Sequence, residues 1–429
     1  MPYLFVGAGQ AGSAIVDDVF GHRRISRLAT PLVFNSTIRD LQNLSNVDRS
    51  AWFGVSETDG LVRGETDGFE SRVTGGFGRD PKDADSVMEE RSDEVTREIR
   101  TVLQAQDEPF SYVFVFLGLG GGTGCGIAPH LVESIRESTE SDVDVIAVGV
   151  LPNTTGPVSE GDEQVSAPRQ AWNALYGLDR LEDHVEGIVL VDNERLAYQD
   201  AAESRFSEYN EYVASAIVDL VSGPVLERID PSTYDDVDAQ VVDMKDIVTT
   251  LRLGSDGERT GYATIGRAVT MTRSLAGYLL PFVGKRAVDG VNLLHQSVSK
   301  QTLADADPTR AQKALGSVRA PASYVSGDDY RINVSAVDRQ LKSFCGEVNY
   351  GMTPTAPNPA PFTTLLTYAR SPLGRLDAPE APAADHPERA QSAGAGGGVV
   401  LVPDDRGLWP GAVVWLVSGP LALRDAPAH

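Results

Sequence analysis

Cysteine is scarce in this sequence, since only Cys125 and Cys345 occur among its 429 residues. Two cysteines cannot build a disulfide framework and are not in metal-ligand spacing, so a reducing compartment is expected. Long apolar runs are absent too, because none reaches the roughly 18 to 20 residues of a membrane-spanning helix. Residues 3–6 are apolar, but no basic stretch precedes them, so no signal peptide is expected. These absences predict a cytoplasmic protein.

Positive charge is the second shortage. Asp and Glu outnumber Lys and Arg by 61 to 37, which gives a formal net charge of −24 and a pI near 4.6. Nucleic acids are bound by clustered Lys and Arg, so the sequence predicts no nucleic-acid partner. Lysine occurs only at positions 82, 245, 285, 300, 313 and 342. An acidic excess with so little lysine is similar to proteins of halophiles, and an ordinary acidic cytosolic protein is the alternative.

Glycine, by contrast, is concentrated in one segment. Residues 112–117 are a continuous apolar run typical of a buried strand, and five glycines follow in the seven positions 118–124. Glycine removes Cβ atoms from a turn, so backbone N–H groups can converge on an anion beside the N-terminus of the next helix. A flexible linker would not need the buried strand. A P-loop needs Lys and then Ser or Thr after its last glycine, and residues 123–126 are Thr-Gly-Cys-Gly.

A second glycine segment lies near the N-terminus. Residues 7–12 read Gly-Ala-Gly-Gln-Ala-Gly between the first expected strand and the first expected helix. This spacing also fits a dinucleotide-binding loop, which requires an Asp or Glu for the ribose at the end of the next strand. The sequence has Asn35-Ser36-Thr37 there instead. A nicotinamide dehydrogenase is therefore disfavoured, and saturable binding of NADH would be its test.

Short apolar segments alternate with amphipathic ones up to about residue 200, which predicts a mostly parallel sheet with helices on both faces. The expected strands are Tyr3–Val6, Leu32–Phe34, Tyr112–Leu117, Val143–Leu151 and Gly187–Val191. The expected helices are Ala11–Phe20, Ser86–Ala105, Ile127–Ser138, Gln170–Leu181 and Arg205–Ser222. A second α/β segment follows, with strands Tyr262–Val269 and Phe362–Tyr368 and a helix Ser335–Phe344. Ligands of such sheets bind at the carboxyl ends of the strands, where the glycine segments fall.

The run Gly-Gly-Gly-Thr-Gly-x-Gly at 120–126 resembles the signature loop of the tubulin/FtsZ family, and Gly-Gln-Ala-Gly at 9–12 resembles the first loop of tubulins and the archaeal CetZ proteins. The resemblance implies a tubulin/FtsZ fold: a Rossmann-like, parallel-sheet GTP-binding domain (1–204), a long central helix (205–223), a second α/β domain that activates the GTPase (224–372) and a low-complexity tail (373–429). The tail contains an apolar segment, 411–423. It is expected to dock on the body of the protein, with a partner or membrane-surface peptide as the alternative.

The resemblance also implies which residues hold GTP or GDP with Mg²⁺, with no separate metal site. Residues 74–81 are similar to a third loop that closes on the γ-phosphate. Where the family carries Ser or Thr, this chain has Cys125, and a thiol is a weaker donor than a hydroxyl. The implied phosphate-binding residues are Gly9, Gln10, Ala11, Gly12, Asn35, Gly75, Gly76, Gly78, Gly118, Gly120, Gly121, Gly122, Thr123, Gly124, Cys125 and Gly126.

Four further residues are implied for the ribose and the base. Glu160 stands where the family has an acid for the ribose, although Gln164 replaces a nearby arginine of FtsZ. Asn193 matches an asparagine that reads guanine. Phe206 and Asn210 are four positions apart on one helix face, where an aromatic ring would stack on the base and an amide would bind its edge. Core packing for Phe206 and a solvated surface for Asn210 are the alternatives.

The catalytic candidate lies far along the chain. Residues 240–248 resemble the loop that one subunit inserts into the nucleotide site of its neighbour, and Asp243 aligns with its final acid. Gln240 replaces a second acid, so slow hydrolysis is expected. The resemblance implies a GTPase that polymerises head to tail with itself, or with related tubulin/FtsZ-family proteins, in cell shape or division, and that reaches membranes only through partners or its tail. The alternative is a nucleotide-binding regulatory homologue with weak or no hydrolysis.

Overall fold

The computed structural model describes residues 3–22, 25–105, 109–139, 143–153, 166–194, 202–222, 242–254, 257, 259–272, 286–303, 305–325, 332–355, 359–371, 373 and 376. All of them belong to one compact unit, Met1–Ala381. No helix within these ranges is both long enough and apolar enough to span a bilayer.

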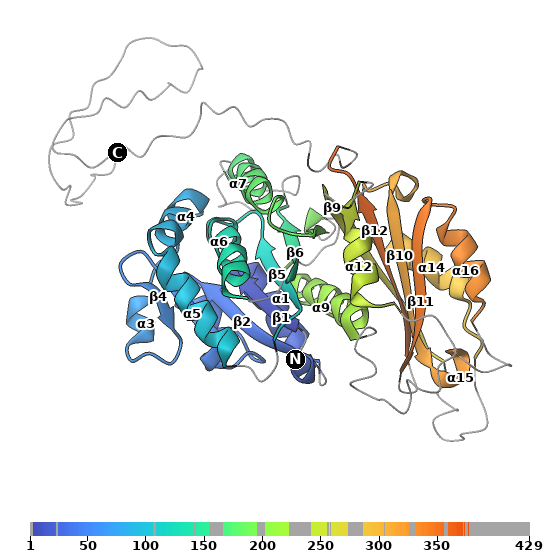
Figure 1. Cartoon of the computed structure of the whole chain (residues 1–429), viewed down its shortest axis with the longest axis horizontal. Helices are drawn as coiled ribbons and strands as arrows, with labels where there is room; N and C mark the ends of the chain where they lie inside the picture. The colour runs from blue at the N-terminus through green and yellow to red at the C-terminus, as the bar shows by residue number, and fades with distance from the viewer. Residues whose placement is uncertain are drawn as a thin grey trace, which may run out of the picture. The chain divides into compact units, whose positions relative to one another are not determined.

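Five parallel strands form the sheet of the N-terminal half (Figure 1). In spatial order they are β7 (Gly187–Asp192), β6 (Asp144–Leu151), β5 (Tyr112–Gly118), β1 (Tyr3–Ala8) and β2 (Ala29–Asn35). Beyond β2, β3 (Trp52–Ser56) also pairs in parallel, and the sheet ends in β4 (Gly60–Arg63), which is antiparallel to β3. All residues of β1 and β7 are buried, as continuous apolar runs require when helices cover both faces.

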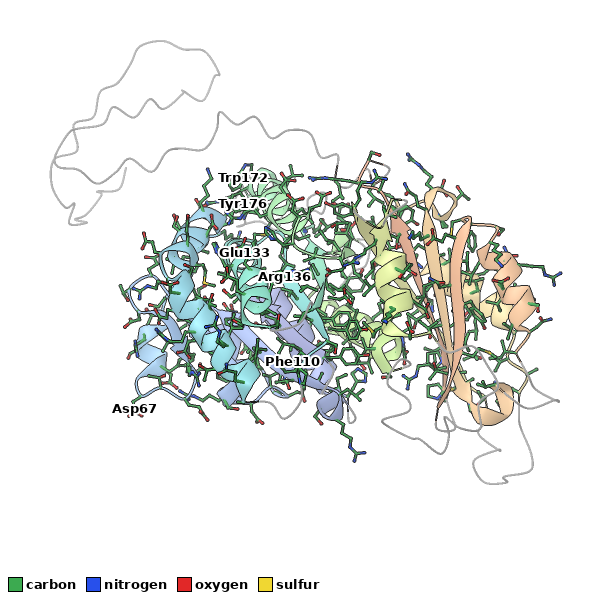
Figure 2. All side chains as sticks on the ribbon, in the orientation of Figure 1. Asp67, Phe110, Glu133, Arg136, Trp172 and Tyr176 are labelled. Atoms are coloured by element: carbon green, nitrogen blue, oxygen red, sulfur yellow. The ribbon has the colours of Figure 1, made fainter. Side chains whose placement is uncertain are left out.

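The two faces of β1 belong to two different cores. Leu4 and Val6 pack with residues of α4, α5, α6 and α7, whereas Tyr3 and Phe5 pack with residues of α1, α9 and α12. The helices are α1 (Gly9–Phe20), α2 (Ile38–Gln42), α3 (Phe69–Arg72), α4 (Pro81–Glu90), α5 (Ser92–Gln104), α6 (Gly122–Ser138), α7 (Ser166–Leu181), α9 (Ala202–Ser222) and α12 (Met244–Leu251). Figure 2 shows Trp172 and Tyr176 together on α7, where their rings stack 5.2 Å apart.

The sheet continues into the C-terminal half. β9 (Arg259–Thr270) pairs in parallel with β7, from Gly187 opposite Gly261 to Leu190 opposite Thr264. The remaining elements are the two-residue β8 (Arg252–Leu253), α14 (Gly290–Ser299), β10 (Lys313–Pro321), α15 (Ala322–Val325), α16 (Val334–Leu341), β11 (Glu347–Thr355) and β12 (Ala360–Tyr368). β12 lies between β9 and β10, antiparallel to both, and β11 forms the outer edge. The expected domain boundaries remain predictions across this continuous sheet.

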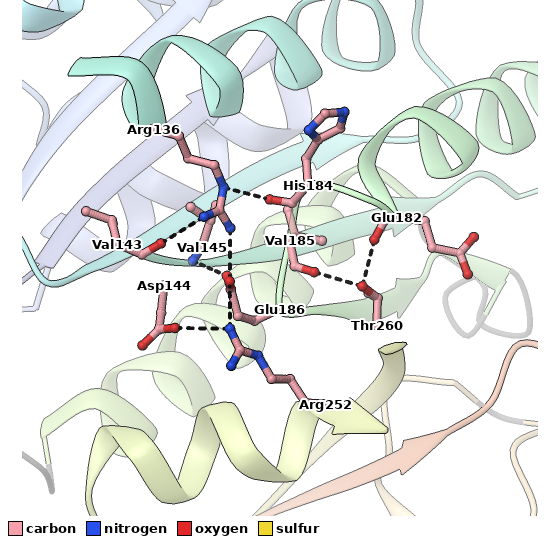
Figure 3. A network of polar contacts seen from close by, with 10 residues as sticks. All are labelled: Arg136, Val143, Asp144, Val145, Glu182, His184, Val185, Glu186, Arg252 and Thr260. Carbon is pink, nitrogen blue, oxygen red and sulfur yellow. Dashed lines mark hydrogen bonds and ion pairs between the residues drawn. The ribbon is translucent and has the colours of Figure 1, made fainter. Parts of the chain in front are cut away.

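A buried carboxylate connects the two halves (Figure 3). Glu186, whose side chain is 7% exposed, precedes β7 and accepts hydrogen bonds from the guanidinium groups of Arg136 on α6, at 2.9 Å, and Arg252 after α12, at 3.0 Å. It also accepts from the backbone N–H of Val145 in β6. The Arg252 guanidinium forms a further ion pair, at 3.5 Å, with Asp144. One side chain thereby fixes α6, β6 and the segment after α12 relative to one another.

One expected helix was wrong. Ser86–Ala105 is not continuous, because α4 ends at Glu90 and α5 begins at Ser92. At the junction, Arg91 leaves the helical conformation, with φ −121° and ψ 22°, and its guanidinium donates to the carbonyl oxygen of Thr58 at 2.9 Å. The acidic first turn that follows suits the start of a new helix. The other expected strands and helices are present, with ends that differ by up to five residues.

Candidate functional site

The candidate site lies at the carboxyl ends of three adjacent strands. Ala8 pairs with Phe34 of β2 on one side and with Leu117 of β5 on the other, so the loops that follow these strands start side by side. This is the edge at which open parallel sheets bind ligands. Two of these loops lead directly into helices, α1 and α6, whose N-termini point toward the same region.

The first loop requires its glycines for two reasons. Gly9, the first residue of α1, has φ +71°, which is the left-handed region. A Cβ at Gly12 would overlap the carbonyl oxygen of Phe116, so α1 can pack against β5 only with glycine there. Gln10 is exposed and Ala11 is partly exposed on the first turn of α1.

The second loop ends in the N-terminus of α6. Gly118 is the last residue of β5, and Gly120 and Gly121 form a turn before α6, whose first five residues are the remaining predicted positions, Gly122, Thr123, Gly124, Cys125 and Gly126. The N-cap, Gly121, has no side chain, and the first turn contains no acidic residue. A Cβ at Gly124 would lie 3.0 Å from the carbonyl oxygen of Ala8, so this loop lies directly on the first one.

The described helices begin in two ways: some have a side-chain cap, and others, among them α1, α2, α3, α5 and α6, have none. No side chain caps the N-terminus of α1 or α6. In contrast, α12, α14 and α16 begin with side-chain caps from Asp243, Asp289 and Asn333. Uncapped first-turn N–H groups lack intrahelical partners and carry the positive end of the helix dipole, so they form a ready anion site.

Cys125 points into the protein. The residue is fully buried, and its thiol donates to the carbonyl oxygens of Leu119, at 3.1 Å, and Gly118, at 3.5 Å. Burial raises the pKa of this thiol far above its ordinary value, so the group stays neutral. A Cβ at Gly177 of α7 would lie 2.9 Å from the sulfur. The thiol thus faces backbone carbonyls of the glycine loop. The assignment of Cys125 to the phosphate site, through its backbone, remains a prediction.

Hydroxyl and amide groups lie where the loops meet. Ser36 and Thr123 approach each other at 2.8 Å between their side-chain oxygens. Asn35 is 2% exposed and ends β2; its amide donates to Asp40 at 3.4 Å, and its oxygen accepts from the backbone N–H of Thr37 at 3.2 Å. Burial raises the pKa of Asp40, with the Asn35 hydrogen bond opposing that effect. Asn35 thus uses both ends of its side-chain amide to hold the loop after β2. It stands where a dinucleotide site would carry an acid for the ribose.

The third loop lies over the loop after β2. A Cβ at Gly76 would be 3.5 Å from the Thr37 hydroxyl oxygen, whereas Cβ atoms at Gly75 and Gly78 would meet no atom within 4 Å. After Gly78, the backbone passes directly against α6, because a Cβ at Gly122 would lie 2.6 Å from the carbonyl carbon of Arg79. The third loop therefore contacts the first residue of α6, and its expected closure on the γ-phosphate remains a prediction.

Sequence reasoning missed Asn173. This residue of α7 is completely buried, and its amide nitrogen donates to the carbonyl oxygens of Arg79, at 2.9 Å, and Gly120, at 3.1 Å. It therefore ties the third loop to the glycine loop. An asparagine in the buried face of an otherwise amphipathic helix was the available signal, because a buried amide needs partners.

The expected base-side residues are only partly described. Asn193 lies in the turn after β7, and its backbone N–H donates to the carbonyl oxygen of Leu151 at 3.3 Å, so it belongs to the same sheet edge. Asn210 is partly exposed on α9. Phe206 lies on the same helix, but its side chain is outside the described part, as are Glu160, Gln164 and Gln240. The assignments of these residues remain predictions.

Asp243 lies near the amino end of β5, opposite to the carboxyl ends at which the glycine loops lie. It caps α12 in a capping box: its carboxylate accepts from the backbone N–H of Asp246, and the Asp246 carboxylate accepts from that of Asp243, each at 2.9 Å. The pKa of Tyr112 is raised, mainly by burial and also by the carboxylates of Asp144 and Asp243. Tyr112 and Asp144 are the first residues of β5 and β6. β5 is seven residues long from Tyr112 to Gly118, a span of roughly 20 Å.

A cavity of about 690 Å³ also lies away from the glycine loops. Arg136, Glu186 and Arg252 line it, together with residues 182–185 and 369–371, so it borders the network of Figure 3. Its walls carry both arginines and carboxylates, many of them paired with one another. The glycine loops remain the candidate anion site, because the uncapped N-termini of α1 and α6 begin there.

Comparison with known proteins supports the resemblance drawn from the motifs. Residues 3–199 match the model of the tubulin/FtsZ family GTPase domain. Cell division protein FtsZ 1 of Pyrococcus woesei is 33% identical over 174 residues, which are 39% of this chain and 41% of that protein. The tubulin-like protein CetZ of Pyrococcus horikoshii is 26% identical over 263 residues, 61% of each chain. These matches thus span less than two thirds of the relatives' lengths.

Solved structures extend the likeness to the whole fold. CetZ2 of Haloferax volcanii, in a GTPγS-bound protofilament, aligns with a TM-score of 0.62 at 21% identity and covers 88% of this chain and 97% of that one. An empty FtsZ dimer of M. jannaschii aligns with a TM-score of 0.56 at 20% identity, over 86% and 89% of the two chains. The predicted tubulin/FtsZ fold is confirmed, and residues 3–199 are similar to the GTPase domain of this family.

Proposed function

We propose that this chain binds GTP and GDP at its glycine loops, assembles head to tail with copies of itself and hydrolyses GTP where two copies meet. Its place would be the cytoplasm of an archaeal cell, in a filament that acts in cell shape or division. The family of residues 3–199 supports a cytoskeletal type of GTPase. The protofilament and dimer forms of the structural relatives support self-association.

This proposal rests on the distance between the expected phosphate site and the expected catalytic residue, Asp243. The anion site lies at the carboxyl ends of β1, β2 and β5, and Asp243 lies near the opposite ends of the same sheet, roughly 20 Å away along β5. One copy of the chain cannot bring Asp243 to its own phosphates. A second copy stacked in the same orientation would bring its Asp243 edge to the glycine edge of the first. Such a heterologous contact repeats without closing, so it generates a filament.

The residues present fit a magnesium nucleotide. Backbone N–H groups of two uncapped helices suit the phosphates, and the Ser36 and Thr123 hydroxyls, with Asp40 behind Asn35, are the oxygen donors that Mg²⁺ accepts. Mg²⁺ is normally held by few protein oxygens and by the phosphates themselves, and it supplies neutralising charge to them. Among the described residues, no group of three or more His, Cys, Asp or Glu side chains could hold a metal ion by itself.

In GTP hydrolysis, the glycine loops and Asp243 would have different roles. The glycine loops hold the phosphates and donate hydrogen bonds to the oxygens on which charge develops. Asp243 of the adjoining copy orients the attacking water and accepts its proton. Cleavage then removes the phosphate that the third loop contacts, which weakens the contact between copies. Nucleotide state and assembly are thereby coupled.

The dependence of turnover on protein concentration tests this proposal. Phosphate release from GTP would be measured over a range of protein concentrations, with sedimentation of polymer from the same samples. We expect release per chain to be low in dilute protein and to rise steeply where sedimentation begins. A rate per chain that is independent of concentration would refute a site shared between copies, and failure to bind GTP would refute the function itself.

A second function is supported by the role of Asp243 as a helix cap. One of its carboxylate oxygens already accepts a hydrogen bond from the backbone of α12, so a structural role accounts for this residue. The substitutions Gln164 and Gln240 point the same way. The alternative is therefore a nucleotide-binding homologue that adds to filaments as a regulator without efficient hydrolysis. Polymer that sediments with GTP while phosphate release stays at background would favour it.

A further inference from the structure

Arg79 is the only basic residue in the four loops that meet at the site. Those loops are residues 7–12, 35–37, 74–80 and 118–126, and every other position in them is neutral or acidic. A nucleoside triphosphate carries several negative charges, and its last phosphate adds charge that a diphosphate lacks. The position of one cation in such a site therefore bears directly on which of the two nucleotides is preferred.

The backbone of Arg79 adopts a conformation that arginine rarely takes. Its φ is +63°, and among the described residues it is the one non-glycine residue with φ in the left-handed region. Gly78 before it has φ +53°, and the backbone N–H of Asp80 donates to the carbonyl oxygen of Phe77 at 2.7 Å. This is the pattern of a turn with positive φ at both central positions, for which Gly, Asn and Asp are the favourable residues. Arginine at the second position is a strained choice that local structure does not explain.

The surroundings hold Arg79 against the phosphate-binding helix. Its carbonyl carbon would lie 2.6 Å from a Cβ on Gly122, the first residue of α6, so its backbone touches the start of that helix. Asn173 fixes the carbonyl oxygen of Arg79 at 2.9 Å, and the amide oxygen of this fully buried asparagine has no hydrogen-bond partner. The Arg79 side chain is exposed, and its guanidinium forms no ion pair with any described residue. The backbone of Arg79 is thus anchored at the start of α6, while no described residue pairs with its charge.

We propose that Arg79 is the residue that distinguishes a nucleoside triphosphate from a diphosphate, by placing its guanidinium on the terminal phosphate. Asn173 is the positioning residue that keeps the third loop in the required turn. The strain at Arg79 is the cost of having a charged side chain where a turn would favour Asn. This inference rests on the proposed nucleotide site and adds to it a source of selectivity.

The test compares binding of two probes, GTPγS and GDP, to dilute protein by calorimetry. Arg79→Asn removes the charge and suits the turn, so we expect its affinity for GTPγS to fall about 10-fold, as for one charge-assisted hydrogen bond. Its affinity for GDP should change less than about twofold, and its Tm should not fall. Arg79→Lys keeps the charge and should lose about threefold for GTPγS. Arg39→Gln, which removes an exposed cation from neighbouring α2, is the matched control and should change neither affinity.

Each other outcome is decisive. Equal selectivity for GTPγS over GDP in Arg79→Asn and in the wild-type chain would overturn the inference and leave the proposed function standing. An equal loss of affinity for both nucleotides would also overturn it, because a purely structural role predicts that result. If the wild-type chain bound neither nucleotide, the proposed function and the inference would both be wrong.

Discussion

Asp243 has two possible roles, as a helix cap and as a catalytic acid, and one pair of substitutions separates them. Asparagine accepts the same N-cap hydrogen bond as aspartate, so Asp243→Asn keeps the contact to the backbone N–H of Asp246 and loses only the charge. Asp243→Ala removes both. A cap is worth about 1 kcal/mol, and its charge near the helix N-terminus a further few tenths. We therefore expect Asp243→Ala to lower the Tm by roughly 2 °C and Asp243→Asn by less than 1 °C.

For hydrolysis, the charge of Asp243 should matter more than its cap hydrogen bond. If Asp243 orients and deprotonates water in the site of the adjoining copy, Asp243→Asn should lose phosphate release by at least about 100-fold, which is the usual contribution of a general base. The binding of GTP to dilute protein should be unchanged in both variants, because Asp243 lies at the far edge of the sheet from the glycine loops. Phosphate release under conditions that sediment the wild-type polymer is the measurement.

Asp289 offers a matched control. It is an exposed aspartate that caps α14 and accepts from the backbone N–H groups of Val291 and Asn292 at 3.1 and 3.0 Å. Asp289→Ala should cost the same stability as Asp243→Ala and leave phosphate release unaltered. If Asp243→Asn hydrolyses GTP at the wild-type rate while Asp243→Ala does not, the residue acts only as a cap and the catalytic assignment fails.

Three further substitutions test other parts of the structure. Glu186→Ala leaves two guanidinium groups without their shared carboxylate, so the free energy of unfolding in urea should fall by about 3 kcal/mol; a fall below 1 kcal/mol would show that the network adds little. Cys125→Ser should leave GTP affinity within about twofold, because the thiol faces backbone carbonyls, and a clear gain would restore the phosphate role. Burial and the nearby carboxylates of Asp17 and Glu211 raise the pKa of Asp18 to about 6. The folded chain therefore holds a proton that the unfolded chain releases near pH 4, and stability should fall as pH rises from about 4 to 6; Asp18→Asn should abolish that part of the Tm profile.

The parts of the fold that depend on local pattern were predictable. β1 with α1, and β5 with α6, follow from apolar runs that end in glycine, since a buried parallel strand needs the run and a close approach of backbone needs the glycine. Gly12 of α1 illustrates this, because Phe116 of β5, against which the helix packs, leaves no room for a Cβ. The pairing of β7 with β9 was not predictable, because the two strands are far apart in the sequence and no local signal specifies which edge β9 joins.

The site was predictable at the level of its backbone and not at the level of its side chains. Glycine spacing located the loops, but it does not show that the thiol of Cys125 turns inward or that Arg79 has a positive φ. Both depend on what packs against them: Gly177 of α7 beside the sulfur, and Asn173 on the carbonyl of Arg79. The Asp243 cap could be predicted from local sequence, because Asp-x-x-Asp before an apolar helix is a capping-box pattern.

The composition of the chain and the construction of its site are consistent with each other. With a net charge of −24 and few lysines, the chain as a whole repels a polyphosphate. A site built from backbone N–H groups and two helix N-termini does not depend on that overall charge, because its dipoles act over the first turn of each helix. In such a site a single arginine contributes selectivity more than affinity, since the backbone already binds the phosphates common to both nucleotides. This reasoning predicts that salt up to about 1 M, at which charges more than about 3 Å apart are screened, weakens the binding of GTPγS to Arg79→Asn less than to the wild-type chain.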